Sequence, residues 1–88
     1  MIVEKKAGHT EKFVDKKAYK IFCRACLNAH LSEEKASVIA TKALKDLKKF
    51  LGRKKKINSD EIFKQNIKIL KKYNKEVAFL YETHRDIN

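Results

Sequence analysis

The chain has 88 residues, which allows one domain (1–88) with a modest core, because a domain this small buries only about 60–65% of its unfolded surface. Its 22 Lys and Arg against 11 Asp and Glu give a formal net charge of +11, which favours an anionic partner: a nucleotide, a nucleic acid or an acidic protein surface. No apolar run approaches the ~20 residues that span a membrane, and charge follows Met1-Ile2-Val3 at once. We therefore expect a soluble, cytoplasmic protein with no signal peptide and no membrane partner.

Residues 2–13 predict a small β-hairpin. Two short extended arms, 2–6 and 9–13, flank Ala7-Gly8, and glycine tolerates the positive φ of a tight turn. The charged residues of the arms are Lys5, Lys6, Lys12 and Glu11. A basic hairpin folded against a helix start can hold a polyanion such as a triphosphate. The alternative is a solvated edge hairpin whose lysines only discourage aggregation.

Two helices are expected next. The first covers residues 15 to about 28, with Asp15 as its cap and Lys16 and Lys17 in its first turn. Its predicted buried face consists of Ala18, Phe22, Ala25, Cys26 and Ala29. Ser32 caps the second helix, which runs to about residue 51 and stops at Gly52. Its predicted buried face consists of Ala36, Ile39, Ala40, Ala43, Leu47 and Phe50.

Two more helices complete the chain. Residues 57–62 read INSDEI, an apolar residue and a cap followed by acids, which is typical of a helix start. This third helix continues to about residue 73, with Ile62, Asn66, Leu70 and Tyr73 along one face and Phe63 and Ile67 beside it. A last helix, 75 to about 86, carries Val77, Ala78, Leu80, Tyr81 and His84. With residues 53–56 as a basic connector, the layout is a β-hairpin followed by four helices, a mainly α chain of the α+β class.

The densest basic run is 42–56, with eight basic residues against the single acid Asp46. It could grip the phosphates of DNA or RNA, so the alternative function is a small basic nucleic-acid-binding helical protein. A solvated helix face is the simpler interpretation.

Signs of catalysis are missing. Gly8 and Gly52 alone cannot supply a glycine-rich phosphate loop or a dinucleotide fingerprint. Cys23 and Cys26 form a CxxC inside a helix, where packing is expected, although with His30 they could join a zinc site. No nucleophile has a recognisable base, so we expect no enzyme and no metal site.

In their order and spacing, short motifs along this chain resemble those of the ATP-cone family, the nucleotide-sensing domain at the front of ribonucleotide reductases and in a related transcriptional repressor. The family opens with V-x-K-R-D-G, E-x-F and a helix containing D-x-x-K-I. Here residues 3–8 read VEKKAG, 11–13 read EKF and 15–17 read DKK. The family's I-x-S-x-E-I corresponds to INSDEI at 57–62, and V-A-x-x-Y-x-x-Y-R corresponds to VAFLYETHR at 77–85. The resemblance covers essentially all of the chain.

The resemblance implies an N-terminal β-hairpin packed on a four-helix bundle, and a non-catalytic regulatory domain that binds ATP or dATP, with or without Mg²⁺, under the hairpin. The nucleotide-contacting positions that it implies are Lys5, Lys6, Gly8, Glu11, Lys17, Ser59 and Arg85. The lysines would contact phosphates, whereas Glu11 would bind the base or sugar, or brace the hairpin. Ser59 would supply a hydroxyl, and apolar residues of the first and third helices would bound the adenine pocket.

The chain departs from the family pattern at several positions, and in the last motif His84 stands in place of the second tyrosine. The turn aspartate is Ala7, the frequent arginine is Lys6, and Phe63 stands where some members hold a nucleotide-contacting histidine. The family domain regulates something attached to it, so the chain is expected to be either a piece of a larger protein or a free-standing sensor. Its partner would be a reductase or another regulated protein, in cis or in trans, and self-association stays open.

Overall fold

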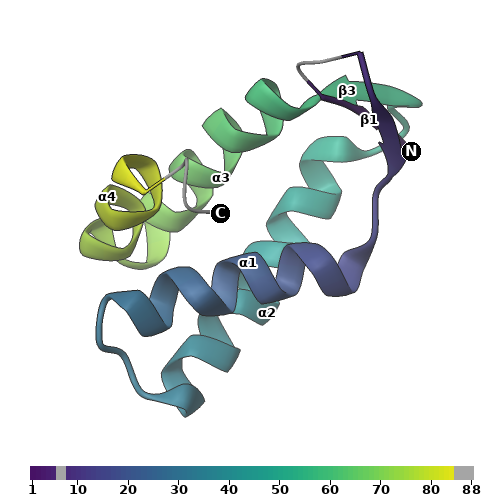
Figure 1. Cartoon of the computed structure of the whole chain (residues 1–88). Coiled ribbons are helices and arrows are strands. Elements are labelled where there is room, and N and C mark those ends of the chain that lie inside the picture. The colour runs from purple at the N-terminus through teal and green to yellow at the C-terminus, as the bar shows by residue number, and fades with distance from the viewer. Residues whose placement is uncertain (6–7, 85–88) are drawn as a thin grey trace.

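The computed structural model describes residues 1–5 and 8–84, in which four helices lie beside one small sheet (Figure 1). The elements in chain order are β1 (Ile2–Glu4), β2 (Thr10–Lys12), α1 (Asp15–Asn28), α2 (Glu33–Leu51), β3 (Lys56–Asn58), α3 (Ser59–Tyr73) and α4 (Lys75–Thr83). The sheet lies where α2 ends and α3 begins, and α4 lies at the far end of α3 (Figure 1). The predicted mainly helical α+β class with four helices is confirmed.

The predicted hairpin is present. Strands β1 and β2 pair antiparallel, with Val3 opposite Glu11. In the turn, the Lys5 N–H donates to the His9 carbonyl at 2.7 Å and the Gly8 N–H donates to the Lys5 carbonyl at 3.1 Å. Gly8 has a φ of +79°, the left-handed conformation that favours glycine.

A third strand, which was not predicted, completes the sheet. It begins at Lys56, the last residue of the expected basic connector 53–56, so that prediction was wrong at this residue. Strand β3 pairs parallel with β1, so the order is β2-β1-β3 and Ile57 lies opposite Val3. This pairing joins segments more than fifty residues apart in the chain. Three residues are too few to show a period-two pattern, so the sequence carries no local signal for the strand.

Strand alternation sorts the side chains of the hairpin onto two faces. Val3 and its partner Ile57 are 7% and 4% exposed and belong to the core. Lys5 lies two residues after Val3, and Glu11 pairs with Val3, so both start from the same inner face. Glu4 is on the outer face, where its Oε1 lies 2.7 Å from Lys56 Nζ. The hairpin therefore directs Lys5 and Glu11 toward the helices.

The caps of α1 and α2 agree with the sequence prediction in all but one position. Ser32 accepts a hydrogen bond from the Lys35 N–H at 3.1 Å, and Gly52 ends α2 with a φ of +49°. Asp15, however, is the first helical residue, and the cap position is Val14, which makes no side-chain bond. Aspartate is also favourable in the first turn because the helix dipole attracts negative charge there. Its carboxylate instead accepts a hydrogen bond from Lys48 Nζ on α2 at 2.7 Å.

Asparagines begin α3 and α4. Asn58 Oδ1 accepts from the Glu61 N–H at 2.9 Å, and Asn74 Oδ1 accepts from the Val77 N–H at 3.0 Å. Asn74 also donates its N–H to the Leu70 carbonyl at 2.8 Å, so one residue ends α3, as predicted, and caps α4. Helix α4 ends at Thr83, and the expected continuation to residue 86 falls on residues 85–88, outside the described part of the chain.

The core lies between the helices and the inner face of the sheet. Every residue of the predicted α1 stripe is buried, as are Ala36, Ala40, Ala43 and Leu47 of α2. Ile39 and Phe50 are only partly buried, whereas Leu51, which the stripe did not include, is 4% exposed. Helix α1 packs on α2 and α4, and α3 packs on α2 and α4. This packing fixes the start of α1 and the start of α3 on either side of the hairpin.

Candidate functional site

A cavity of about 300 Å³ lies between the hairpin, α1 and α3. Six polar side chains line it: Lys5, Glu11, Lys12, Lys17, Ser59 and Asn66. The rest of the wall is mostly apolar and includes Ile21 of α1, Leu47 of α2, Ile62 and Phe63 of α3 and Tyr81 of α4. Its volume is at the lower end of that of small-molecule pockets, which hold roughly 300–1,000 Å³.

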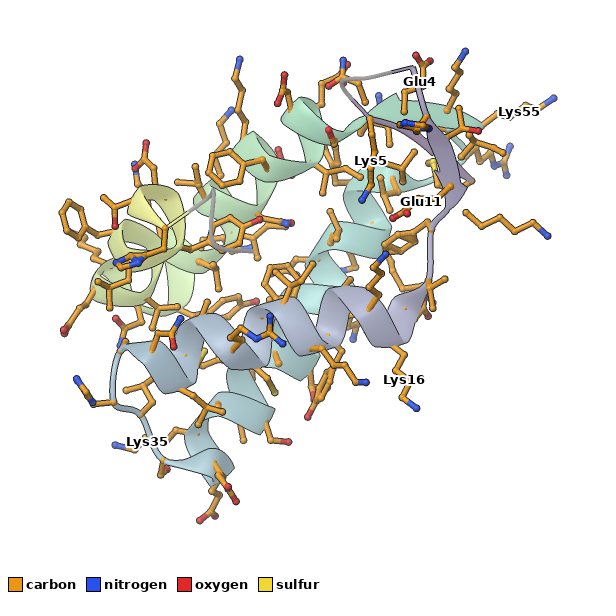
Figure 2. The ribbon with its side chains drawn as sticks, viewed as in Figure 1. Glu4, Lys5, Glu11, Lys16, Lys35 and Lys55 are labelled. Atoms are coloured by element: carbon orange, nitrogen blue, oxygen red, sulfur yellow. The ribbon has the colours of Figure 1, made fainter. Side chains whose placement is uncertain are left out.

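Glu11 joins the hairpin to α1 at this cavity. Its Oε1 lies 3.2 Å from Lys5 Nζ and 3.1 Å from Lys17 Nζ. The Lys5 and Glu11 side chains point toward one another in the space between the strands and α1 (Figure 2). The hydrogen bond from Lys17, followed by that from Lys5, holds the pKa of the Glu11 carboxyl below its ordinary value. Both lysine side chains stay in contact with water, at 46% and 59% exposure, so an entering anion can reach them.

The charge at the cavity is positive. The lining residues include three lysines, Lys5, Lys12 and Lys17, and one carboxylate, that of Glu11, which leaves two positive charges. Ser59 is the first residue of α3, where backbone N–H groups without a helical partner favour anions. The cavity therefore combines cations, a hydroxyl and a helix start with apolar side chains in one lining.

Two aromatic rings form part of the apolar wall. The centroids of Phe63 and Tyr81 are 5.0 Å apart with an interplanar angle of 32°, so α3 and α4 are joined by a ring contact at the cavity. Aromatic and aliphatic surfaces of this kind accept a flat apolar group such as a nucleobase.

Asn66 is a polar side chain set among these apolar residues. It is 4% exposed, and its Nδ2 donates to the Tyr81 hydroxyl at 3.1 Å. Its Oδ1 is buried and accepts no hydrogen bond. Leaving a buried acceptor unsatisfied costs about 1–3 kcal/mol, so such groups are rare in folded proteins. An unsatisfied amide oxygen in a cavity wall is a place where a ligand donor would be stabilising.

The structure brings together four of the seven sequence-predicted site residues, Lys5, Glu11, Lys17 and Ser59, which all line the cavity. Gly8 forms the hairpin turn and is not a lining residue. Lys6 and Arg85 lie outside the described residues, so their positions are not assigned.

Sequence reasoning did not assign Lys12, Asn66 or Tyr81 to the site. A signal for Asn66 was present, because it follows Ser59 and Ile62 at helical spacing and interrupts an apolar face.

The basic run 42–56 lies mostly away from this cavity. Of its residues, only Leu47 lines the cavity. Lys48 pairs with Asp15 and Lys56 with Glu4, each at 2.7 Å, and the Lys55 side chain extends away from the protein (Figure 2). Three of these cations, Lys45, Lys48 and Lys49, line a second pocket on α2 together with Asp15, Thr41 and Leu44. The others are spread over α2, the following loop and β3.

The cysteines belong to the core. Cys26 is fully buried, and burial raises the pKa of its thiol to about 11, which leaves it in the unreactive thiol form. The Cys23 thiol lies 3.9 Å from the Ala36 carbonyl oxygen on α2. Among residues 1–5 and 8–84, no three His, Cys, Asp or Glu side chains are grouped so that they could hold a metal ion.

Within the same described residues, no helix is long and apolar enough to cross a bilayer. Comparisons with known proteins add no identification: no protein-family model, no curated protein and no solved structure matches this chain. The ATP-cone resemblance stays a prediction that depends on the sequence motifs and on the site described above.

Proposed function

We propose that this chain is a non-catalytic, ATP-cone-like regulatory domain that binds ATP or dATP in the cavity under the hairpin. The four-helix bundle of that family, with the hairpin packed on it, is part of the proposal. The observation that carries it is the convergence of Lys5 and Lys17, from separate elements, on one point at the mouth of a largely apolar cavity. A cavity lined by both cations and apolar side chains fits a ligand with a polyanionic tail and an aromatic head.

Lysine recognition of the phosphates follows from this arrangement. The two ammonium groups share the Glu11 carboxylate, which holds the positive charges close to one another. A triphosphate carries more charge than one carboxylate and offers several oxygens, so it competes for both lysines. Ser59 and the start of α3 face the same cavity and add hydrogen-bond donors.

Regulation would follow from the exchange of partners at Glu11. In the structure this residue links the hairpin to α1 through ion pairs with Lys5 and Lys17. When phosphates bind the lysines, contacts through the ligand replace the ion pairs of Glu11. The preferred position of the hairpin relative to α1 then changes. A nucleotide shifts such an equilibrium by its differential affinity for the two states. The change in the hairpin surface would then alter its binding to a reductase, to another regulated protein or to a second copy of the chain.

A thermal-shift series tests the proposal. ATP, dATP, ADP and GTP are titrated with and without Mg²⁺, and a ligand at 100 times its Kd should add about 2.7 kcal/mol of stability. We expect ATP or dATP to stabilise the protein more than ADP, because the third phosphate completes the contact with the lysines. Absence of stabilisation by every nucleotide would contradict the proposal.

The alternative, a nucleic-acid-binding surface on 42–56, makes a different prediction. Its affinity for DNA or RNA would fall steeply with salt, because each neutralised phosphate releases counterions, and ATP would have no effect on stability.

A further inference from the structure

The side chain of Asn66 is satisfied at one end only. Its amide nitrogen donates to the Tyr81 hydroxyl at 3.1 Å, which leaves the amide oxygen as the free end. The residue is 4% exposed and belongs to the wall of the cavity that holds Lys5 and Lys17. It lies on α3 two turns after Ser59, on the side of the cavity where Ile62 and Phe63 also lie. A hydrogen-bonding group is thus placed beside apolar side chains of α3, on another element than the lysines.

We propose that Asn66 is the residue that reads the base of the bound nucleotide, with its Oδ1 accepting a hydrogen bond from the exocyclic 6-amino group of adenine. The inference rests on the proposed function, since it assumes that the phosphates lie at the lysines. It goes beyond that function because it assigns base recognition to one atom on α3 and not to the hairpin.

The free atom defines the chemistry of its ligand. A carbonyl oxygen accepts and cannot donate, so the group that meets it must carry a hydrogen. The 6-position of adenine carries an amine, whereas guanine carries an oxygen there, and two acceptors would repel one another. An acyl chain would fit the apolar wall but would leave the amide oxygen unsatisfied, so an aminated aromatic ring fits better than a lipid.

The geometry also predicts a movement. Oδ1 has essentially no exposed surface in the empty protein, so the base must displace a neighbouring side chain to reach it. Phe63 is half-buried in the same wall and rests on Tyr81, the partner of Asn66. Binding of the base therefore alters the contact between α3 and α4 as well as the tie between hairpin and α1.

Calorimetric titration of the whole chain with two probes tests the assignment. ATP is compared with purine riboside triphosphate, which lacks only the 6-amino group. We expect ATP to bind the wild-type protein about tenfold more tightly, the effect of about 1.4 kcal/mol from one buried hydrogen bond. In Asn66→Leu the ratio of the two Kd values should fall to about one. In Gln65→Leu, a change on the same helix at a residue that does not line the cavity, the tenfold ratio should persist.

Asn66→Leu leaves the Tyr81 hydroxyl without its amide partner, so a second variant guards against loss of folding. Asn66→Leu combined with Tyr81→Phe removes both ends of the bond, a replacement that is often close to neutral for stability. The Kd ratio should be about one there as well.

The outcomes separate this inference from the proposed function. Equal binding of the two probes by the wild-type protein overturns the role of Asn66 and leaves the nucleotide site standing. A tenfold ratio that persists in Asn66→Leu and in the double variant also overturns the role of Asn66 and leaves the nucleotide site standing. If neither probe binds the wild-type protein, the proposed function and the base assignment are overturned together.

Discussion

Removing one lysine ammonium from the mouth of the cavity is the sharpest perturbation that the structure offers. Lys17 Nζ lies 3.1 Å from Glu11 Oε1, on the first turn of α1, and its side chain is 59% exposed. Lys17→Ala removes one charge-assisted contact to phosphate. Such contacts contribute about 1.5–3 kcal/mol, and the exposure of Lys17 reduces its share to just below that range, about 1.4 kcal/mol or a tenfold change in Kd.

The expected thermal shift follows from mass action. At 100 times the wild-type Kd, ATP stabilises the wild-type protein by about 2.7 kcal/mol, and a variant with a tenfold weaker Kd gains only about 1.4 kcal/mol. For a domain of this size, 1 kcal/mol moves Tm by about 4–8 °C. The wild-type shift is then about 11–22 °C, and that of Lys17→Ala is about 6–11 °C. Lys5→Ala should behave in the same way.

Lys16→Ala is the matched control for this experiment. Lys16 is the neighbouring residue on α1 and carries the same charge, but its side chain points away from the cavity (Figure 2). Lys54→Ala removes a charge from the basic loop, where the ammonium lies 5.4 Å from the centroid of the Phe50 ring. Both controls should keep the full wild-type shift. If either of them reduces it as much as Lys17→Ala, ATP binds through general positive charge and the reasoning about the cavity is wrong.

Three further predictions concern the ion pairs of Glu11, the partly exposed Asp46 and strand β3. Glu11→Gln should weaken the contact of the hairpin with α1 and lower the Tm of the protein without ligand. It should also strengthen the binding of inorganic tripolyphosphate, because the lysines lose their competing carboxylate. Weaker tripolyphosphate binding would refute this. The hydrogen bond from the Tyr73 hydroxyl, followed by that from Lys72, holds the pKa of Asp46 below its ordinary 3.8. The bond between Tyr73 and Asp46 also raises the pKa of Tyr73 to about 12. Asp46 therefore contributes stability above about pH 4 that is lost as pH falls through its lower folded pKa, and Tyr73 contributes stability below about pH 10 that is lost as pH rises through about 12. Tyr73→Phe should lower the pH 7 stability by about 1.5 kcal/mol and flatten both limbs of the pH profile in urea denaturation, and unchanged limbs would contradict the pairing. Ile57→Ala should cost about 2–4 kcal/mol in the same assay if β3 is part of the core, whereas a cost below about 1 kcal/mol would mean that residue 57 is an exposed loop residue.

The helices were predictable because their signals are local. Ser32, Gly52 and Asn74 each begin or end a helix through bonds to residues within four positions, so a reader of the sequence can find them. Asp15 was misplaced by one position because aspartate is favourable both at the cap and in the first turn. Strand β3 could not be predicted, since it pairs with β1 at the other end of the chain.

The residues of the candidate site were predictable from the sequence, but the contacts between them were not. The motifs around Lys5, Glu11, Lys17 and Ser59 identified residues that the fold does bring to one cavity. Their ion-pair geometry was not readable from the sequence, because it depends on which face of the hairpin meets α1. The free oxygen of Asn66 depends on the contact between α3 and α4, so only the structure reveals it.

An amide-resolved NMR titration with ATP tests the central claim most directly, because it locates the ligand as well as detecting it. The account predicts that the largest chemical-shift changes fall at Lys5, Glu11 and Lys17 and in the first two turns of α3, from Ser59 to Asn66. Changes that instead spread along residues 42–56, or a spectrum that ATP leaves unaltered, would show that this cavity is not a nucleotide site.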